Sequence, residues 1–289
     1  MEKSTKELLQ FSILNLDKPS GPTSFNVSDF VRKKVKESGV GKTSHFGTLD
    51  PKVTGVLPIA LGRACKLTGF FLGHDKEYVG IMHVHEEISI EKLQETINKK
   101  FLGKIMQKPP VKSRVKRELR EREIISFEIL ESDDKRNFLF KAKVQGGTYI
   151  RKLIDDLGTE LGIGAHMLEL RRTQAGIFSE EDSRFVNLYD FEKYVEEYKA
   201  GNDKNLRKIL IPGEEAIKRV FSVVQVKEAE IRKLWTGKPL FVKDIIGQAE
   251  IKEDEKFALF CKEKFIGIYR KTDERGIFAR PEFVFQPVR

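Results

Sequence analysis

Residues 41–62 read GKTSHFGTLDPKVTGVLPIALG and decide how the chain is organised. Glycine and proline interrupt this stretch so often that it sustains neither a helical period nor a long alternation, which predicts an ordered loop. A short apolar element, residues 56–61, is expected to follow the loop. Asp50 stands directly before Pro51, which restricts its backbone to extended or turn conformations. The sequence therefore predicts a carboxylate fixed on a rigid corner.

The pair Asp50-Pro51 is also a common helix start, with aspartate as N-cap and proline at the first helical position. The whole segment around this pair, however, closely resembles the catalytic-aspartate motif of a family of pseudouridine synthases; it reads HFGTLDPKVTGVLPIALG. That family includes the bacterial enzyme of the tRNA T-loop uridine and the dyskerin group of guide-RNA enzymes. The resemblance makes Asp50 the essential catalytic residue. It also implies that the neighbouring loop residues support the site: His45, Gly47, Thr48 and Leu49.

Two departures from the family motif stand beside His45, because Ser44 and Phe46 occupy positions where a small residue is more usual. A second word, LNLDKPSGPTS at residues 14–24, resembles the first motif of the same family. Lys18-Pro19 taken alone would be an ordinary solvated turn. The resemblance instead implies that Lys18 and Pro19 support the catalytic loop.

Tyr78 leads into a predicted strand over residues 79–82, and taken alone it would be an ordinary half-buried strand aromatic. In the family the matching tyrosine packs against the target base. The resemblance therefore makes Tyr78 a stacking platform and a candidate proton acceptor.

Arg151 lies in the first turn of a predicted helix, with Thr148 as its expected cap. A positive side chain gains nothing from the helix dipole there, so either it is a plain surface arginine or a carboxylate holds it. The word GTYIRKLIDDLG closely matches the family's third motif, in which the arginine pairs with the catalytic aspartate. The resemblance identifies Arg151 as the partner of Asp50. The following word, GAHMLELRRTQAG, puts Leu170 in the position of the apolar residue against the base.

The chain has 53 Lys and Arg against 44 Asp and Glu, a net charge of +9. This excess favours a polyanionic partner but also suits a soluble surface, so its distribution matters more. Ten of these cations lie in residues 99–122, against only Glu118 and Glu121. Such a run can be a solvated face, but its density beside turn residues favours contact with an RNA backbone. The residues predicted to make this contact are Lys112, Arg114, Lys116 and Arg117.

No metal or cofactor is expected. The two cysteines are far apart, and His83 and His85 have no third ligand nearby in the sequence. There is no GxGxxG or P-loop, and isomerising uridine to pseudouridine involves no net redox change. The sequence also shows no signal peptide or membrane span, which predicts a soluble protein in the cytoplasm.

The resemblance implies an α+β fold with a mixed, largely antiparallel sheet, flanking helices and a central cleft. It divides the chain into a catalytic domain, residues 1–220, and a small C-terminal PUA β-barrel, residues 221–289. The first 11 residues are expected to be an extension that packs on the PUA domain. Within that domain Gly237 and Lys238 are predicted to contact RNA.

The substrate has two interpretations within the family. Bacterial enzymes recognise the tRNA T-arm unaided and carry an insertion after the tyrosine motif, whereas here HVHEEISIEKL follows without one. That word and QKPPVKSRVKR resemble the archaeal branch, which uses a box H/ACA guide RNA with small Nop and Gar subunits and a ribosomal-protein-like kink-turn binder. We therefore expect a guide-dependent enzyme acting on rRNA and on tRNA. A stand-alone T-loop enzyme is the alternative, and a non-catalytic RNA-binding scaffold is a third hypothesis, opposed by the joint presence of Asp50, Tyr78 and Arg151.

Overall fold

The computed structural model describes residues 3–109, 116, 118–274 and 276–286. By their contacts the residues divide into two compact units, Met1–Ile211 and Pro212–Arg289. This division falls a few residues before the boundary expected after residue 220. Each unit is described by itself below.

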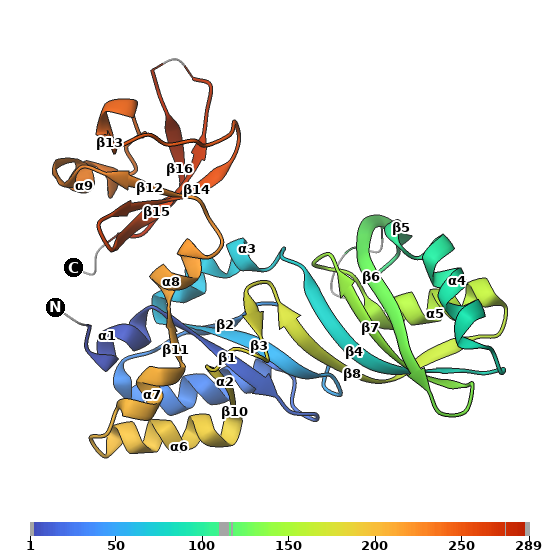
Figure 1. The fold of residues 1–289 in the computed structure, drawn as a ribbon. Helices are drawn as coiled ribbons and strands as arrows, with labels where there is room; N and C mark the ends of the chain where they lie inside the picture. Colours follow the sequence, from blue (N-terminus) through green and yellow to red (C-terminus); the bar gives the residue numbers. More distant parts are fainter. Residues whose placement is uncertain (1–2, 110–115, 117, 275, 287–289) are drawn as a thin grey trace. The chain divides into compact units, whose positions relative to one another are not determined.

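One mixed sheet runs through the larger unit, in the order β10-β1-β3-β8-β4-β7-β6-β5, with β11 on β1, β2 on β3 and β9 on β8 (Figure 1). Its pairs are antiparallel except for β1 with β10 and β3 with β8. The predicted mixed and largely antiparallel sheet is thereby confirmed. The strands are β1 Ser12–Lys18, β2 Thr43–His45, β3 Thr54–Leu61, β4 Lys76–Val84, β5 Gly103–Gln107, β6 Arg120–Ser132, β7 Asn137–Val144, β8 Ala165–Ala175, β9 Phe178–Ser179, β10 Phe185–Asn187 and β11 Leu210–Pro212.

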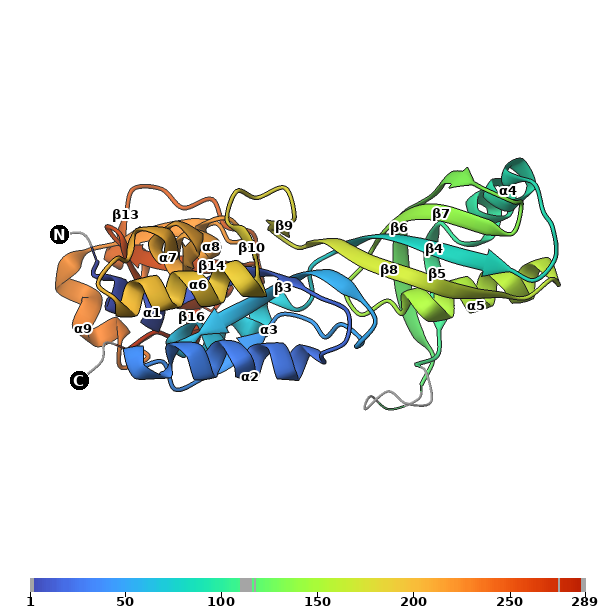
Figure 2. The same ribbon diagram turned by 90° about the horizontal axis from the view of Figure 1, so that it is seen from below.

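The sheet has two halves that meet at a narrow seam, because β3 pairs with β8 over only two residues, Thr54 and Gly55. Helices α2 and α6 lie along the half that contains β1 and β3, and α4 and α5 lie along the other half (Figures 1 and 2). The helices are α1 Thr5–Gln10, α2 Ser24–Val35, α3 Thr68–Phe71, α4 Ile90–Lys100, α5 Ile150–Leu161, α6 Leu188–Lys199 and α7 Lys204–Ile209, with 3₁₀ turns at Lys36–Ser38 and Gly62–Leu67.

Strand β4 shows how the sequence sets the burial of side chains near the seam. Its residues alternate between buried and half-buried, so that one face enters the core and carries Tyr78. The strand is longer than the four residues expected. Helix α5 buries an apolar stripe of Ile150, Leu153, Ile154 and Leu157. Its cap differs from the prediction: Tyr149 is the N-cap residue, and the Thr148 hydroxyl donates to the Gln145 carbonyl.

The smaller unit is a five-stranded sheet in the order β13-β12-β14-β15-β16. An isolated bridge also joins Leu240 to Ala279. Within residues 212–274 and 276–286 the edge strands β13 and β16 do not pair with each other, so the strand pairing does not close a barrel. The strands are β12 Val223–Val226, β13 Ile245–Ile246, β14 Lys256–Cys261, β15 Lys264–Lys271 and β16 Ala279–Val284; the helices are α8 Gly213–Lys218 and α9 Ile231–Leu234, with 3₁₀ turns at Glu228–Glu230 and Val242–Asp244.

Candidate active site

The loop between β2 and β3 carries Asp50 and ends at the seam of the sheet. The Val53 amide donates to the Asp50 carbonyl at 3.0 Å, which closes a tight turn around the acid. Gly55, at φ +97°, lies against β8, where an added Cβ would come within 2.2 Å of the Arg172 carbonyl oxygen. Only glycine satisfies both the left-handed backbone and this close approach. The loop therefore enters β3 along a single path.

Arg151 reaches this loop from the opposite half of the sheet. Its Nη2 lies 2.7 Å from Oδ2 of Asp50, although the two residues are far apart in the sequence. In the first turn of α5 Ile150 is buried, whereas the Arg151 side chain stays exposed. Both side chains of the pair stay about half exposed, at 59% for Arg151 and 48% for Asp50. The carboxylate is thus oriented and still open to a substrate.

Lys18 holds the loop through hydrogen bonds to its backbone. Its side chain is fully buried, and Nζ donates to the carbonyls of Pro19, Pro51 and Val53 at 2.8–2.9 Å. Burial lowers the pKa of Lys18, and the nearby Asp50 opposes that shift. Lys18 and Pro19 thus lie where the predicted support of the loop requires them.

Ser24 is a second anchor, which the sequence did not reveal. Its hydroxyl accepts from the Leu49 amide at 2.8 Å and lies 3.0 Å from the Leu49 carbonyl. Leu49 itself is buried. The residue before Asp50 is therefore tied to the start of α2, and a serine at a helix start gives no sign of such a contact.

Tyr78 and Leu170 form the apolar part of the site. Tyr78 lies opposite Arg172, and Gly80 lies opposite Leu170, on the paired strands β4 and β8. Both Tyr78 and Leu170 are 7% exposed and belong to one core cluster. An added Cβ at Gly80 would meet Leu170 Cδ1 at 2.8 Å, so the glycine leaves room for the leucine. The packing of a target base against these two side chains stays a prediction.

His45 and Thr48 complete the loop, with His45 Nε2 3.1 Å from Thr48 Oγ1. Burial, and then the charge of Arg172, lower the pKa of His45. A buried lysine lies nearby: Lys76 donates to the Leu72 and His74 carbonyls at 2.9 and 2.7 Å. Burial and Arg172 lower the pKa of Lys76 to about 8.

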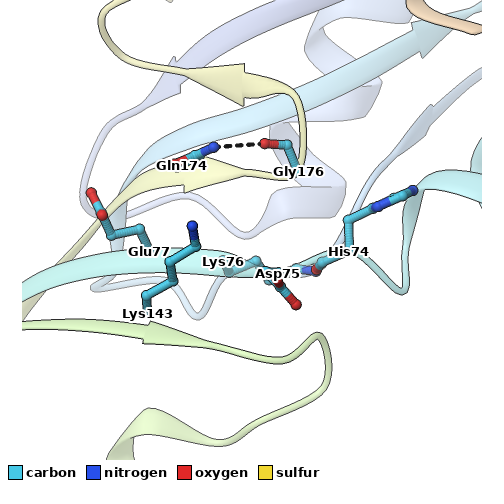
Figure 3. A pocket seen from close by; sticks show the side chains of 7 residues that line it. All are labelled: His74, Asp75, Lys76, Glu77, Lys143, Gln174 and Gly176. Carbon is cyan, nitrogen blue, oxygen red and sulfur yellow. Dashed lines mark hydrogen bonds between the residues drawn. The ribbon is translucent and has the colours of Figure 1, made fainter. Parts of the chain in front are cut away.

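A separate polar hollow of about 190 Å³ opens on the strands before Tyr78 (Figure 3). It does not include Asp50 or Arg151, so it is not the place where these residues act. Its lining residues are His74, Asp75, Lys76, Glu77, Lys143, Gln174 and Gly176.

The predicted RNA-contacting residues are mostly not tested by the structure. Lys112, Arg114 and Arg117 lie outside the described residues, and Lys116 is exposed and paired with Glu118. In the smaller unit, Gly237 is in a turn at φ +87°, directly before Lys238.

Lys238 Nζ lies 3.0 Å from Glu230 and 3.2 Å from Asp244. These two carboxylates compete with any phosphate for its charge. The contact of Gly237 and Lys238 with RNA stays a prediction.

Within the part of the chain that the structure describes, no three His, Cys, Asp or Glu side chains are grouped to hold a metal ion. In the same part, no helix is both long and apolar enough to cross a membrane.

Two family models match the chain. The TruB family pseudouridylate synthase N-terminal domain matches residues 32–150, and the tRNA pseudouridylate synthase B C-terminal domain matches residues 151–218. A "Probable tRNA pseudouridine synthase B" of Korarchaeum cryptofilum is 43% identical over 96% of this chain and 87% of that protein. A protein of the same description from Thermococcus onnurineus is 39% identical over 99% of this chain and 87% of its own.

The chain is also similar to solved structures over nearly its whole length. A chain of a Cbf5-Nop10-Gar1 complex is 36% identical, with a TM-score of 0.88, over 99% of this chain and 88% of that chain. A chain of an H/ACA RNP bound to a substrate RNA containing 2'-deoxyuridine gives a TM-score of 0.87 at 35% identity, over 99% of this chain and 88% of the other. The fold is therefore the α+β pseudouridine synthase fold with a PUA-like domain at its C-terminal end. This chain belongs to the TruB family and is a pseudouridine synthase.

Proposed function

We propose that this pseudouridine synthase is the catalytic subunit of a box H/ACA guide ribonucleoprotein and modifies uridines of rRNA and tRNA in the cytoplasm. The observation that carries the proposal is the likeness, over 99% of the chain, to a chain of a Cbf5-Nop10-Gar1 complex. The likeness extends through the smaller unit and is not confined to the catalytic residues. Its partners are accordingly guide RNA, substrate RNA, small Nop and Gar subunits and a kink-turn binder.

In this proposal Asp50 is the catalytic carboxylate. The target uridine leaves its stack, at a cost of a few kcal/mol, and enters against Tyr78 and Leu170. Arg151, 2.7 Å from Asp50, aims the carboxylate at the nucleotide. The glycosidic bond breaks and the same base rejoins the sugar through carbon. Carbon 5 of the base loses a proton and nitrogen 1 gains one, so the product is an isomer and the reaction consumes no redox equivalent.

The connection after β4 supports the guide-dependent reading. Strand β4 ends at Val84, and α4 begins at Ile90 with Ser89 as its N-cap. The connection between β4 and α4, residues 85–89, is thus too short to contain the insertion of the bacterial T-arm enzymes. The basic run of residues 99–122 supplies phosphate contacts, while pairing between guide and target supplies the sequence specificity.

A stand-alone tRNA enzyme is the second candidate, and the descriptions of the archaeal relatives as tRNA pseudouridine synthases favour it. A purely structural RNA scaffold is disfavoured, because a scaffold has no use for Arg151 held at 2.7 Å from an exposed Asp50.

Reconstitution tests the proposal. The chain is incubated with a substrate RNA alone, with a matching box H/ACA guide, and with the guide plus the accessory proteins. Pseudouridine is located by carbodiimide-dependent reverse-transcription stops. We expect conversion at the paired uridine only with guide, loss when the guide's pairing arms are altered, and recovery with a compensating substrate. Equal conversion of a tRNA T-arm by the chain alone, without any effect of guide, would instead assign the stand-alone activity.

A further inference from the structure

Arg172 is a buried cation that the reaction scheme above leaves without a role. It is 1% exposed and stands first among the largest fully buried side chains. Within the described residues, no carboxylate lies within ion-pair distance of its guanidinium. Burial lowers the pKa of Arg172, yet an arginine does not lose its charge in a protein. Burying an unpaired charge costs several kcal/mol, so its contacts must offset that cost or serve the site.

Arg172 contacts both ends of the loop that carries Asp50 and lies beside Tyr78. Its Nε donates to the Val56 carbonyl at 2.8 Å, and Nη2 donates to the Gly47 carbonyl at 3.0 Å. Gly47 and Val56 flank Asp50 on either side. Tyr78 lies directly opposite Arg172 on the paired strand β4. In a hydrogen bond between these two side chains the guanidinium is the donor and the Tyr78 hydroxyl oxygen the acceptor, because arginine can only donate.

We propose that Arg172 is a positioning residue of the isomerisation, which holds the Tyr78 hydroxyl and both ends of the Asp50 loop in one fixed geometry. The proposal rests on the pseudouridine synthase activity of the family. A planar guanidinium donates in fixed directions to the Gly47 and Val56 carbonyls and, in this proposal, to the Tyr78 hydroxyl. A single ammonium at the end of a flexible stem does not reproduce that arrangement. The orientation of the tyrosine hydroxyl and the position of the aspartate are thereby coupled through one side chain.

The preceding residue provides a matched control. Arg171 lies on the same strand but contacts different elements: Nη1 lies 3.0 Å from Asp17, and Nε lies 2.7 Å from Glu180. It is 37% exposed and has the carboxylate partners that Arg172 lacks. Arg171→Lys therefore makes the same chemical change one residue away, and it leaves the hydrogen bonds to the Gly47 and Val56 carbonyls in place.

The test is a double-mutant cycle, with rates measured over a series of substrate RNA concentrations that reaches saturation, so that kcat and KM are separated. Arg172→Lys is expected to lower kcat by about 100-fold with KM within about threefold of wild type, because a shift of about 1 Å in catalytic geometry has that effect. Arg171→Lys should stay within about threefold in both. If Arg172 acts through the Tyr78 hydroxyl, the double variant Arg172→Lys/Tyr78→Phe should be no slower than the slower single variant.

Multiplying losses in the double variant, or an equal loss in Arg171→Lys, would overturn the proposal and leave Arg172 a structural residue. Circular dichroism melts establish that each variant is folded. If Arg172→Lys unfolds, Arg172→Gln takes its place in the same cycle, because its amide keeps a planar donor in a smaller volume. The activity assignment is judged separately, by whether the wild-type chain forms pseudouridine at all.

Discussion

Replacing Arg151 with lysine is expected to leave the fold intact and to slow the reaction by at least about 100-fold. The Asp50–Arg151 pair is about half exposed on both sides, so solvent screens it. Exposed ion pairs contribute about 0–1 kcal/mol to stability. The free energy of unfolding should therefore change by less than about 1 kcal/mol.

Catalysis responds differently, because it depends on where the carboxylate points. A lysine keeps the charge but is shorter and lacks the planar fork, so Asp50 loses its fixed direction. A 100-fold loss corresponds to about 3 kcal/mol in the barrier, several times the expected stability change.

The assay is single-turnover pseudouridine formation at saturating RNA, beside urea unfolding of the same preparation. Arg171→Lys is the control for a lysine at an ion-paired arginine near the seam. Unchanged kcat in Arg151→Lys would show that Arg151 does not position Asp50. A large drop in stability would show that the pair holds the fold rather than the acid.

Three further predictions follow from buried and basic residues. Lys18→Met should lower the free energy of unfolding, measured in urea, by about 1–3 kcal/mol for each buried carbonyl left without a donor, and should slow turnover. Lys76, with its pKa lowered to about 8, binds a proton less readily in the folded than in the unfolded chain. The free energy of unfolding of wild type minus that of Lys76→Met should therefore rise by about 2 kcal/mol from about pH 7.5 to about pH 10. Charge reversal of the basic run should weaken binding of every guide RNA alike and flatten its salt dependence, measured as dissociation constants across a salt series; an effect confined to one guide would contradict backbone contact. The residues reversed are Lys112, Arg114, Lys116 and Arg117.

The sequence predicted the fold class and the family because three separate segments resemble the family's motifs in the family's order. Each segment lies at a turn or a helix start, where the backbone conformation restricts which residues fit. The proximity of Asp50 and Arg151 could be expected only through the resemblance, since nothing local brings the loop before β3 to the first turn of α5. The structure brings them together at the seam where β3 and β8 meet.

The contacts that secure the site could not be predicted from the sequence. Ser24 holds Leu49 and Arg172 holds Gly47 through backbone atoms, and backbone partners leave no pattern in the residues. Arg172 also follows Arg171, and two adjacent arginines look alike until the strand sends them to opposite faces. The Thr148 cap failed for a related reason, because its hydroxyl found the Gln145 carbonyl in the turn before the helix.

Asp50 is expected to perform the isomerisation, and Asp50→Asn removes its carboxylate with the smallest change in shape. The amide is nearly isosteric but is neither a nucleophile nor a base. Tritium release from RNA labelled at carbon 5 of uridine measures turnover, and a filter-binding titration with the same RNA measures affinity. We expect no detectable tritium release, with RNA affinity within about threefold of wild type, because the half-exposed carboxylate adds little to binding. Turnover within tenfold of wild type by the folded variant would contradict the assignment of Asp50 as the catalytic residue.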